Sequence, residues 1–186
     1  MVAETAAGSQ AGAATLGSLD SSYQVVGYGP KPQEPPPAPV PFPPYQPKVW
    51  GACRARGQDP AKVVRTFYHA SISAGFRSLP AGDSVLYCGN DKYGLLHIEN
   101  EHEDQWDLIA NSRSPTAGNW RYLADYAISA TLAYPERVEY NQDNDTFALY
   151  HKISLPDGTY VFTTRVVISA SDGKIITAFP QTGTRG

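Results

Sequence analysis

Two histidines, His97 and His102, stand in the polar segment HIENEHEDQW and are the side chains best suited to chemistry. Histidine changes its charge near neutral pH, so two imidazoles in one cleft would suit general acid–base catalysis. On a continuous helix five residues span about 500°, or about 140° beyond one turn, so the two rings would face different ways. Both could point into one cleft if His97 ends a strand or turn and His102 opens a helix.

Two alternatives remain open for this pair. The histidines could lie at a solvated helix start, where Glu101, Glu103 and Asp104 favour the positive end of the helix dipole. A metal site with His97, Glu101 and His102 as ligands is the other alternative. It lacks the i,i+4 spacing that places two imidazoles on one helical face.

Arg165 lies in TYVFTTRVVISA (159–170), a run of residues otherwise suited to burial. In a strand, alternation places Thr163 and Arg165 on one face and Thr164 on the other. An arginine in a central strand must reach solvent at a cleft or pair with an anion, because a buried unpaired charge is costly. Phosphate is a natural anion for the planar guanidinium, and a salt bridge to a nearby acid is the alternative.

Three further side chains are candidates for binding a phosphate. Thr177 lies in the last apolar run, KIITAFP, and its hydroxyl could hydrogen-bond a phosphate oxygen, although threonine also has a high β-propensity. Lys152 is a weaker basic candidate in FALYHKISL, and Thr163 shares a strand face with Arg165. The candidate catalytic residues are therefore His97, His102, Arg165 and Thr177, and the candidate substrate-binding residues are Lys152 and Thr163.

The region that must position these side chains follows a proline-rich segment. Ten of the 16 prolines lie between Pro30 and Pro47, and residues 1–29 are rich in Ala, Gly and Ser. Proline fixes φ and removes a backbone donor, so we expect residues 1–47 to be a disordered linker with polyproline II character. A docking site for a proline-recognising partner is the alternative. Residues 48–186 then form one domain, long enough for a single core.

Capping signals predict helices in the first half of this domain. Asp59 and Pro60 resemble the cap and first position of a helix. The segment that holds His97 could be a strand or turn, and helical composition begins at His102. Asn119 resembles a further cap. We expect helices over 61–73, 102–110 and 119–134.

The second half of the domain has strand patterns. Four β-branched and aromatic runs follow Pro135 and are separated by turn signals. They predict an antiparallel meander, and a further short strand is expected at 84–89. Because helices precede the meander, we expect an α+β fold in which the N-terminal helices pack on a roughly four-stranded antiparallel β-sheet.

Composition limits the possible functions. The chain of 186 residues carries a formal charge of −3, which argues against dependence on the phosphate charge of long duplex DNA. It has no apolar run long enough for a transmembrane helix and no conventional secretory signal in its first residues. Common nucleotide-binding, hydrolase and zincin motifs are absent, and Cys53 and Cys88 could form one bridge.

The order of these motifs resembles one toxin superfamily. It runs from LHIxxxHxxxW through NWRYLADYAISATLAYP to a meander that closes on IITAFP, over roughly residues 90–180. This is similar to the C-terminal toxin domains of the barnase/EndoU/colicin/RelE-like (BECR) superfamily, found in bacterial polymorphic and contact-dependent toxins. The resemblance implies one or two helices packed on a four-stranded antiparallel sheet.

The resemblance also implies an activity and partners. Such domains are metal-independent endoribonucleases that need no cofactor and often cut tRNA, by attack of a 2′-hydroxyl that leaves a 2′,3′-cyclic phosphate. His97 would be general base or acid, His102 the second proton-transfer group, and Arg165 the phosphate clamp. Thr177 matches the family's closing-strand hydroxyl, and Lys152 is a further phosphate contact. The resemblance further implies a cognate immunity protein and delivery of a secreted toxin into a target cell.

Two other functions compete with the ribonuclease. The first is a non-catalytic protein-interaction domain on a proline-rich tether, in which both histidines are structural. The second is an NAD-consuming toxin, since Glu99 and Glu101 form an ExE motif. In transferases that use this motif the acidic pair lies late in the fold, whereas here it precedes the arginine strand.

Overall fold

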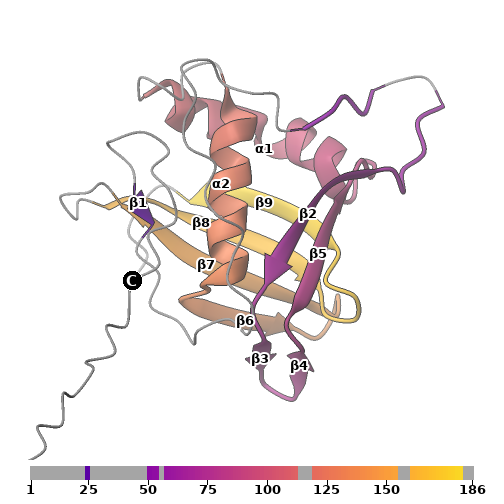
Figure 1. Cartoon of the computed structure of the whole chain (residues 1–186), viewed down its shortest axis with the longest axis vertical. Helices are drawn as coiled ribbons and strands as arrows, with labels where there is room; N and C mark the ends of the chain where they lie inside the picture. Colours follow the sequence, from indigo (N-terminus) through magenta and orange to yellow (C-terminus); the bar gives the residue numbers. More distant parts are fainter. Residues whose placement is uncertain (1–23, 26–49, 55–56, 113–118, 155–159, 182–186) are drawn as a thin grey trace, which may run out of the picture.

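The computed structural model describes residues 24–25, 50–54, 57–112, 119–154 and 160–181 (Figure 1). Apart from its residues 24–25, the expected linker over 1–47 lies outside these residues. The elements are, in chain order, β1 (Gln24–Val25), β2 (Val63–His69), β3 (Ile72–Ala74), β4 (Arg77–Leu79), β5 (Gly82–Tyr87), α1 (Gly94–Asn111), α2 (Trp120–Ala133), β6 (Arg137–Asn141), β7 (Thr146–Ser154), β8 (Tyr160–Ser169) and β9 (Ile175–Gln181).

The main sheet is the predicted meander. Strands β6, β7, β8 and β9 pair antiparallel in sequence order, which confirms the four expected strands and the α+β class. The short β1 pairs with the other end of β7, where Val25 lies opposite Ile153. One face of the sheet carries the buried side chains that form the core, among them Phe147, Leu149 and Phe162.

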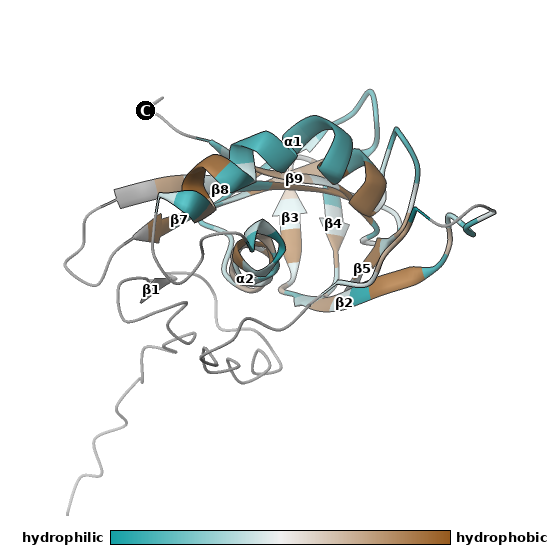
Figure 2. Ribbon diagram, turned by 90° about the horizontal axis from the view of Figure 1, so that it is seen from above, coloured by the Kyte–Doolittle hydropathy of each residue, from teal (hydrophilic) through white to brown (hydrophobic). Residues whose placement is uncertain are grey.

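Helix α2 is the centre of the fold. The side chain of Asn119 accepts a hydrogen bond from the backbone N–H of Tyr122, as predicted for a cap, and the helix ends at Ala133, two residues before Pro135. Ten of its 14 residues are buried. Figure 2 shows the reason, since α2 is seen end-on between the main sheet and the β2–β5 ribbon.

The expected helix over 61–73 is wrong. This segment forms β2, which pairs antiparallel with β5, and then β3, which pairs with β4. Asp59 does accept a backbone hydrogen bond, from Ala61, but it closes a turn and not a helix. The β-branched and aromatic residues that follow favour a strand, and packing against α2 decides in favour of β2. The predicted strand at 84–89 is confirmed in position, since it overlaps β5, which begins two residues earlier at Gly82 and ends at Tyr87.

The expectation that His97 lies on a strand or turn before a helix is also wrong. Helix α1 begins at Gly94 and includes both histidines. Leu95, Ile98 and Trp106 recur at helical spacing and are buried, so the apolar face starts well before His102. The Trp106 indole N–H donates to the Ala178 carbonyl oxygen at 3.1 Å, which fixes α1 along β9.

A short segment at the start of the domain, residues 50–54, is anchored to both helices. Cys53 forms a disulfide with Cys88, and the indole N–H of Trp50 donates to Asp125 at 2.9 Å. Arg54 pairs with Glu99 of α1 at 3.2 Å. Glu99 also pairs with Arg121 of α2, and its side chain is only 4% exposed. One buried carboxylate therefore joins three segments of the chain.

We predict that Glu99→Gln lowers the free energy of unfolding by about 1–3 kcal/mol, because two charge-assisted hydrogen bonds are weakened. Urea denaturation followed by circular dichroism measures this loss. The exposed Glu101→Gln on the same helix is the matched control and should change stability little. Equal stability of both variants would contradict the joining role of Glu99.

We predict that the free energy of unfolding also falls on acidification. His151 is 0% exposed, and this burial lowers its pKa. Glu136 and the Tyr134 carbonyl oxygen lie nearby and oppose the lowering in part. The unfolded chain, with a histidine pKa of about 6.5, then binds more protons than the folded chain below that pH. We expect the Tm to fall as the pH drops from about 7 to about 5, with a smaller fall in His151→Gln. An unchanged slope in the variant would contradict this assignment.

Candidate functional site

The second face of the main sheet, called here the open face, carries most of the predicted site residues. Its side chains alternate with those of the core, so Lys152, Thr163, Arg165 and Thr177 all lie on this face. Thr164, the next residue on β8, is buried on the core side. The predicted alternation on β8 is therefore confirmed.

Strand register builds a row of side chains across the open face. Arg137 of β6 lies opposite Tyr150 of β7, Tyr150 lies opposite Arg165 of β8, and Arg165 lies opposite Phe179 of β9. His102 of α1 continues the row, since its ring stacks on Phe179 with centroids 4.5 Å apart. We call these five residues the ring row.

Contacts within the ring row alternate between cations and aromatic rings. The Arg137 guanidinium lies 3.7 Å from the centre of the Tyr150 ring. The Arg165 guanidinium lies 5.8 Å from the same ring and 5.4 Å from that of Phe179. Cation–π attraction holds such groups together. The row therefore presents two guanidinium groups and an imidazole along one line.

His97 joins the end of this row. Its ring lies edge-on to that of His102, with centroids 5.8 Å apart. The rings meet although both residues lie on one helix, five positions apart. The two histidines therefore come together within one helix. The sequence had predicted that they would do so only if His97 ended a strand or turn and His102 opened a helix.

Hydrogen bonds orient both imidazoles in the same way. His97 Nδ1 lies 2.8 Å from the carbonyl oxygen of Asp91, which can only accept, so Nδ1 carries a proton. His102 Nδ1 lies 3.2 Å from Oε1 of Gln105, which likewise accepts. In each neutral ring Nε2 is then the basic nitrogen. The pair offers two Nε2 atoms for proton transfer.

The two histidines differ in their surroundings. Burial against Phe179 lowers the pKa of His102, the hydrogen bond to Gln105 partly opposes this, and the charge of His97 lowers it further. Near neutral pH His102 is therefore largely the neutral imidazole, which is the form that can accept a proton.

Arg165 and Thr177 carry polar atoms without partners. Arg165 Nε and Thr177 Oγ1 are both buried and make no hydrogen bond. The expected alternative, a salt bridge from Arg165, is not formed within the described part of the chain. In the register of β8 and β9 the two residues are diagonal neighbours on the open face. Unpaired buried donors are costly, so this pair is suited to an incoming acceptor such as phosphate.

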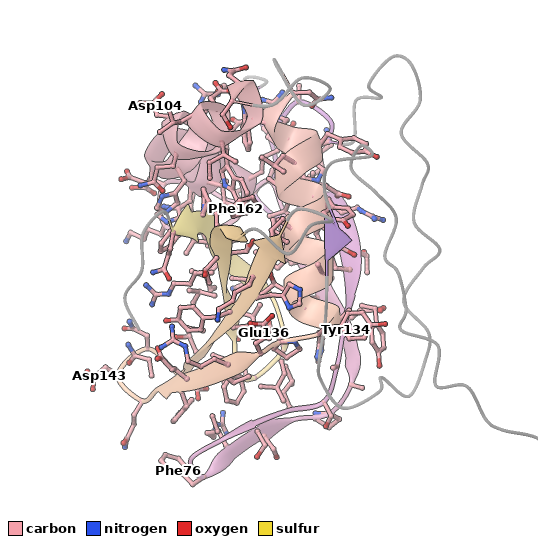
Figure 3. The ribbon with its side chains drawn as sticks, turned by 90° about the vertical axis from the view of Figure 1, so that its left-hand side faces the viewer. Phe76, Asp104, Tyr134, Glu136, Asp143 and Phe162 are labelled. Carbon is pink, nitrogen blue, oxygen red and sulfur yellow. A yellow bond between two sulfur atoms is a disulfide. The ribbon has the colours of Figure 1, made fainter. Side chains whose placement is uncertain are left out.

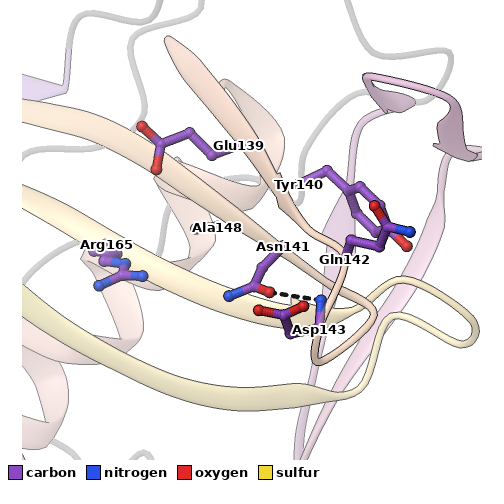
Figure 4. A pocket seen from close by; sticks show the side chains of 7 residues that line it. All are labelled: Glu139, Tyr140, Asn141, Gln142, Asp143, Ala148 and Arg165. Carbon is purple, nitrogen blue, oxygen red and sulfur yellow. Dashed lines mark hydrogen bonds between the residues drawn. The ribbon is translucent and has the colours of Figure 1, made fainter.

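The remaining predicted residues lie beside the ring row. Lys152 is exposed and lies opposite Thr163 across β7 and β8, one row from Arg165. On the other side of the row a hollow of about 330 Å³ lies over Ala148, and Arg165 forms part of its wall (Figure 4). The six predicted residues thus lie on or at the edge of one face.

One of the acidic residues around the histidines, Glu99, is enclosed away from this face, whereas Glu101 lies close enough to His102 to favour its charged form. Glu99 is buried against two arginines, so it does not present an acidic pair with Glu101 to a cleft. This arrangement disfavours the NAD-consuming alternative. Asp104 lies on the outer side of α1, as Figure 3 shows, while Phe162 points into the core. Across the described residues, no group of three or more His, Cys, Asp or Glu side chains is arranged to hold a metal ion.

Four members of this site were not expected from the sequence: Arg137, Tyr150, Phe179 and Glu139. The Tyr150 hydroxyl donates to Glu139 at 2.7 Å, and Arg137 donates to the same carboxylate at 2.6 Å. Each lies in a predicted strand, but only the register between strands places them beside Arg165. One pattern in the sequence could have found them, namely the alternation of side chains along β8, if the same alternation is applied to the neighbouring strands.

Comparison with known proteins places the chain in a family. The fold is an α+β domain, and one face of its main sheet is lined with cations and aromatic rings. No family model matches the sequence. Two curated Mycobacterium tuberculosis proteins are each 81% identical over 182 residues, which is 98% of this chain and 68% of the relative. They are "Uncharacterized protein Rv0739" of strain ATCC 25618 / H37Rv and "Uncharacterized protein MT0764" of strain CDC 1551 / Oshkosh. The chain belongs to the family of these proteins.

Neither described helix is long and apolar enough to cross a membrane.

We predict that His102 titrates below pH 6.5, which is the usual value for histidine, because burial against Phe179 disfavours its charged form. Phe179→Leu should expose the imidazole and move the midpoint upward. Proton NMR titration of the histidine ring signals measures both. Leu108→Ala, at an exposed position of the same helix, should leave the midpoint unchanged. A wild-type midpoint above 6.5 would contradict the described packing.

Proposed function

We propose that this protein is a metal-independent endoribonuclease whose open face binds and cuts RNA, with tRNA as the expected substrate. The single observation that carries the proposal is the ring row with His97 at its end, because it aligns the Arg165 guanidinium with two histidines that both offer Nε2. Cleavage of RNA by its own 2′-hydroxyl needs a base, an acid and donors for charge on phosphate. The open face supplies each kind of group.

Each side chain has a defined role in the proposed reaction. His102 Nε2 takes the proton of the 2′-hydroxyl, since the lowered pKa keeps this imidazole neutral. The O2′ atom attacks the adjacent phosphorus, and the bond to the 5′-oxygen of the next nucleotide breaks. Protonated His97 donates its Nε2 proton to that leaving oxygen. The products are a 2′,3′-cyclic phosphate and a free 5′-hydroxyl.

Charge that develops on the phosphate is stabilised by the orphaned donors. Arg165 offers Nε and its terminal nitrogens in the planar fork that fits phosphate oxygens. Thr177 is the diagonal neighbour of Arg165 and adds a hydroxyl donor. Lys152 of β7 lies one row from Arg165 and adds a positive charge beside it, whereas the charge of Arg137 is paired with Glu139. A local positive strip of this kind can bind RNA although the whole chain has a net charge of −3.

The biological setting is part of the same proposal. A ribonuclease of this type would act as a toxin, delivered by secretion into a target cell and neutralised in its producer by an immunity protein. The Cys53–Cys88 disulfide supports passage through an oxidising compartment, where such bridges persist. The proposal therefore combines cleavage, export and a protein inhibitor.

One observation favours the second candidate function, a protein-interaction domain. Phe76 at the tip of the β3–β4 hairpin is 73% exposed and contacts Tyr140, with ring centroids 5.3 Å apart. Arg77 pairs with Asp145 at 2.8 Å and holds the hairpin in place. An exposed aromatic on a fixed hairpin is suited to anchoring a partner.

We predict that the purified full chain cuts total tRNA in the presence of EDTA and leaves 2′,3′-cyclic ends. His102→Ala and His97→Ala should each lower the rate roughly 10²–10⁴-fold, as for lost proton-transfer groups. Arg165→Gln should lower the rate about 10²-fold or more through lost stabilisation of charge on phosphate. Gel analysis with end-group mapping measures each rate.

Matched controls separate chemistry from folding. Lys62→Gln removes a cation distant from the open face and should keep full activity, and circular dichroism should show every variant folded. Intact RNA with the wild type, at high enzyme and without any inhibitor protein, would refute the ribonuclease. The interaction-domain alternative would then lead, and Phe76→Ser would be its first variant.

A further inference from the structure

The hollow over Ala148 has the features of a ligand site that the proposed reaction has not used. It forms because a small side chain lies on the open face between larger neighbours. Figure 4 shows Glu139, Asn141, Asp143 and Arg165 directed toward this space, whereas Tyr140 and Gln142 point away from it. Its volume of about 330 Å³ lies at the lower end of the range for small-molecule sites.

The side of the hollow opposite Arg165 is rich in hydrogen-bond acceptors. The Glu139 side chain is 50% exposed and accepts one hydrogen bond on each oxygen, from Arg137 and from Tyr150. A carboxylate has about four acceptor sites, so Glu139 can accept more. Asp143 makes no side-chain hydrogen bond or ion pair to any other described residue. The side-chain oxygen of Asn141 accepts from the Asp143 backbone N–H at 2.9 Å, so Asn141 offers its amide N–H groups to the hollow. A ligand that enters here can donate to the two carboxylates and accept from Asn141.

The wall nearest the ring row has the opposite character. Arg165 lines the hollow and also carries the unpaired Nε that we assign to phosphate. The two carboxylates repel a phosphate, so an anionic ligand would lie with its phosphate at Arg165 and its neutral, donor-bearing part over Ala148. A nucleotide has this division of charge.

We propose that the hollow over Ala148 holds the base of the nucleotide whose phosphate is bound by Arg165, and that it selects bases with an exocyclic amino group. Adenine, cytosine and guanine each carry an amino group, whereas uracil has a single ring N–H donor between two carbonyl acceptors. Glu139 and Asp143 can accept from that one N–H, but a uracil oxygen beside it would meet acceptor against acceptor. The inference rests on the proposed ribonuclease and names its base preference.

Calorimetric titration of the full chain with 3′-AMP, 3′-CMP, 3′-GMP and 3′-UMP tests this preference, because these products bind without being cut. We expect 3′-UMP to bind about tenfold or more weakly than the other three, the effect of one lost hydrogen bond to a charged acceptor. Asp143→Asn and Glu139→Gln should each reduce this ratio, since an amide can donate to the uracil oxygen. Asp104→Asn on the outer side of α1 removes the same charge and should leave the ratio unchanged.

The outcomes separate this inference from the ribonuclease itself. RNA cleavage combined with equal binding of all four nucleotides, or with binding of none, would overturn the base site and leave the ribonuclease. Amino-base preference that survives in both hollow variants would also overturn it. Selective nucleotide binding without RNA cleavage would support the hollow and refute the ribonuclease. Failure of both measurements would refute both.

Discussion

The burial of helix α2 is the constraint on which the rest of the structure depends. Most of its surface is apolar, so a single sheet face could cover only one side of it. The β2–β5 ribbon covers the opposite side, and the helix becomes the middle layer of the domain (Figure 2). The segment after Pro60 provides this second cover as a strand, in agreement with its β-branched and aromatic residues.

The central position of α2 determines where chemistry can occur. It occupies the core face of β7 and β8, which leaves the other face of the same strands to solvent. Helix α1 lies along β9, and the face that buries Ile98 and Trp106 there also places His102 against Phe179. The packing that stabilises α1 therefore also places the His102 imidazole at the end of the ring row.

Charge is divided between structural and available groups. Glu99 is enclosed by Arg54 and Arg121, and Asp125 is held by Trp50 and Arg65, so these acids hold segments together. Arg165 has no acidic partner within the described residues, and this member of the ring row also lines the acceptor-rich hollow. A chain with a small net charge can therefore keep one strongly polar site.

The sequence by itself determined the local features: the α+β class, the meander, the Asn119 cap and the alternation that places Arg165 and Thr164 on different faces of β8. Turn residues and period-two patterns act over a few positions, so they are readable without tertiary information. Only the tertiary structure decided that 63–69 is a strand, that α1 begins at Gly94, and that Phe179, Tyr150 and Arg137 line up with His102. Strand register and helix packing join residues that are far apart in the chain. The free energy gained from these tertiary contacts is larger than the weak local preference of a segment for helix or strand.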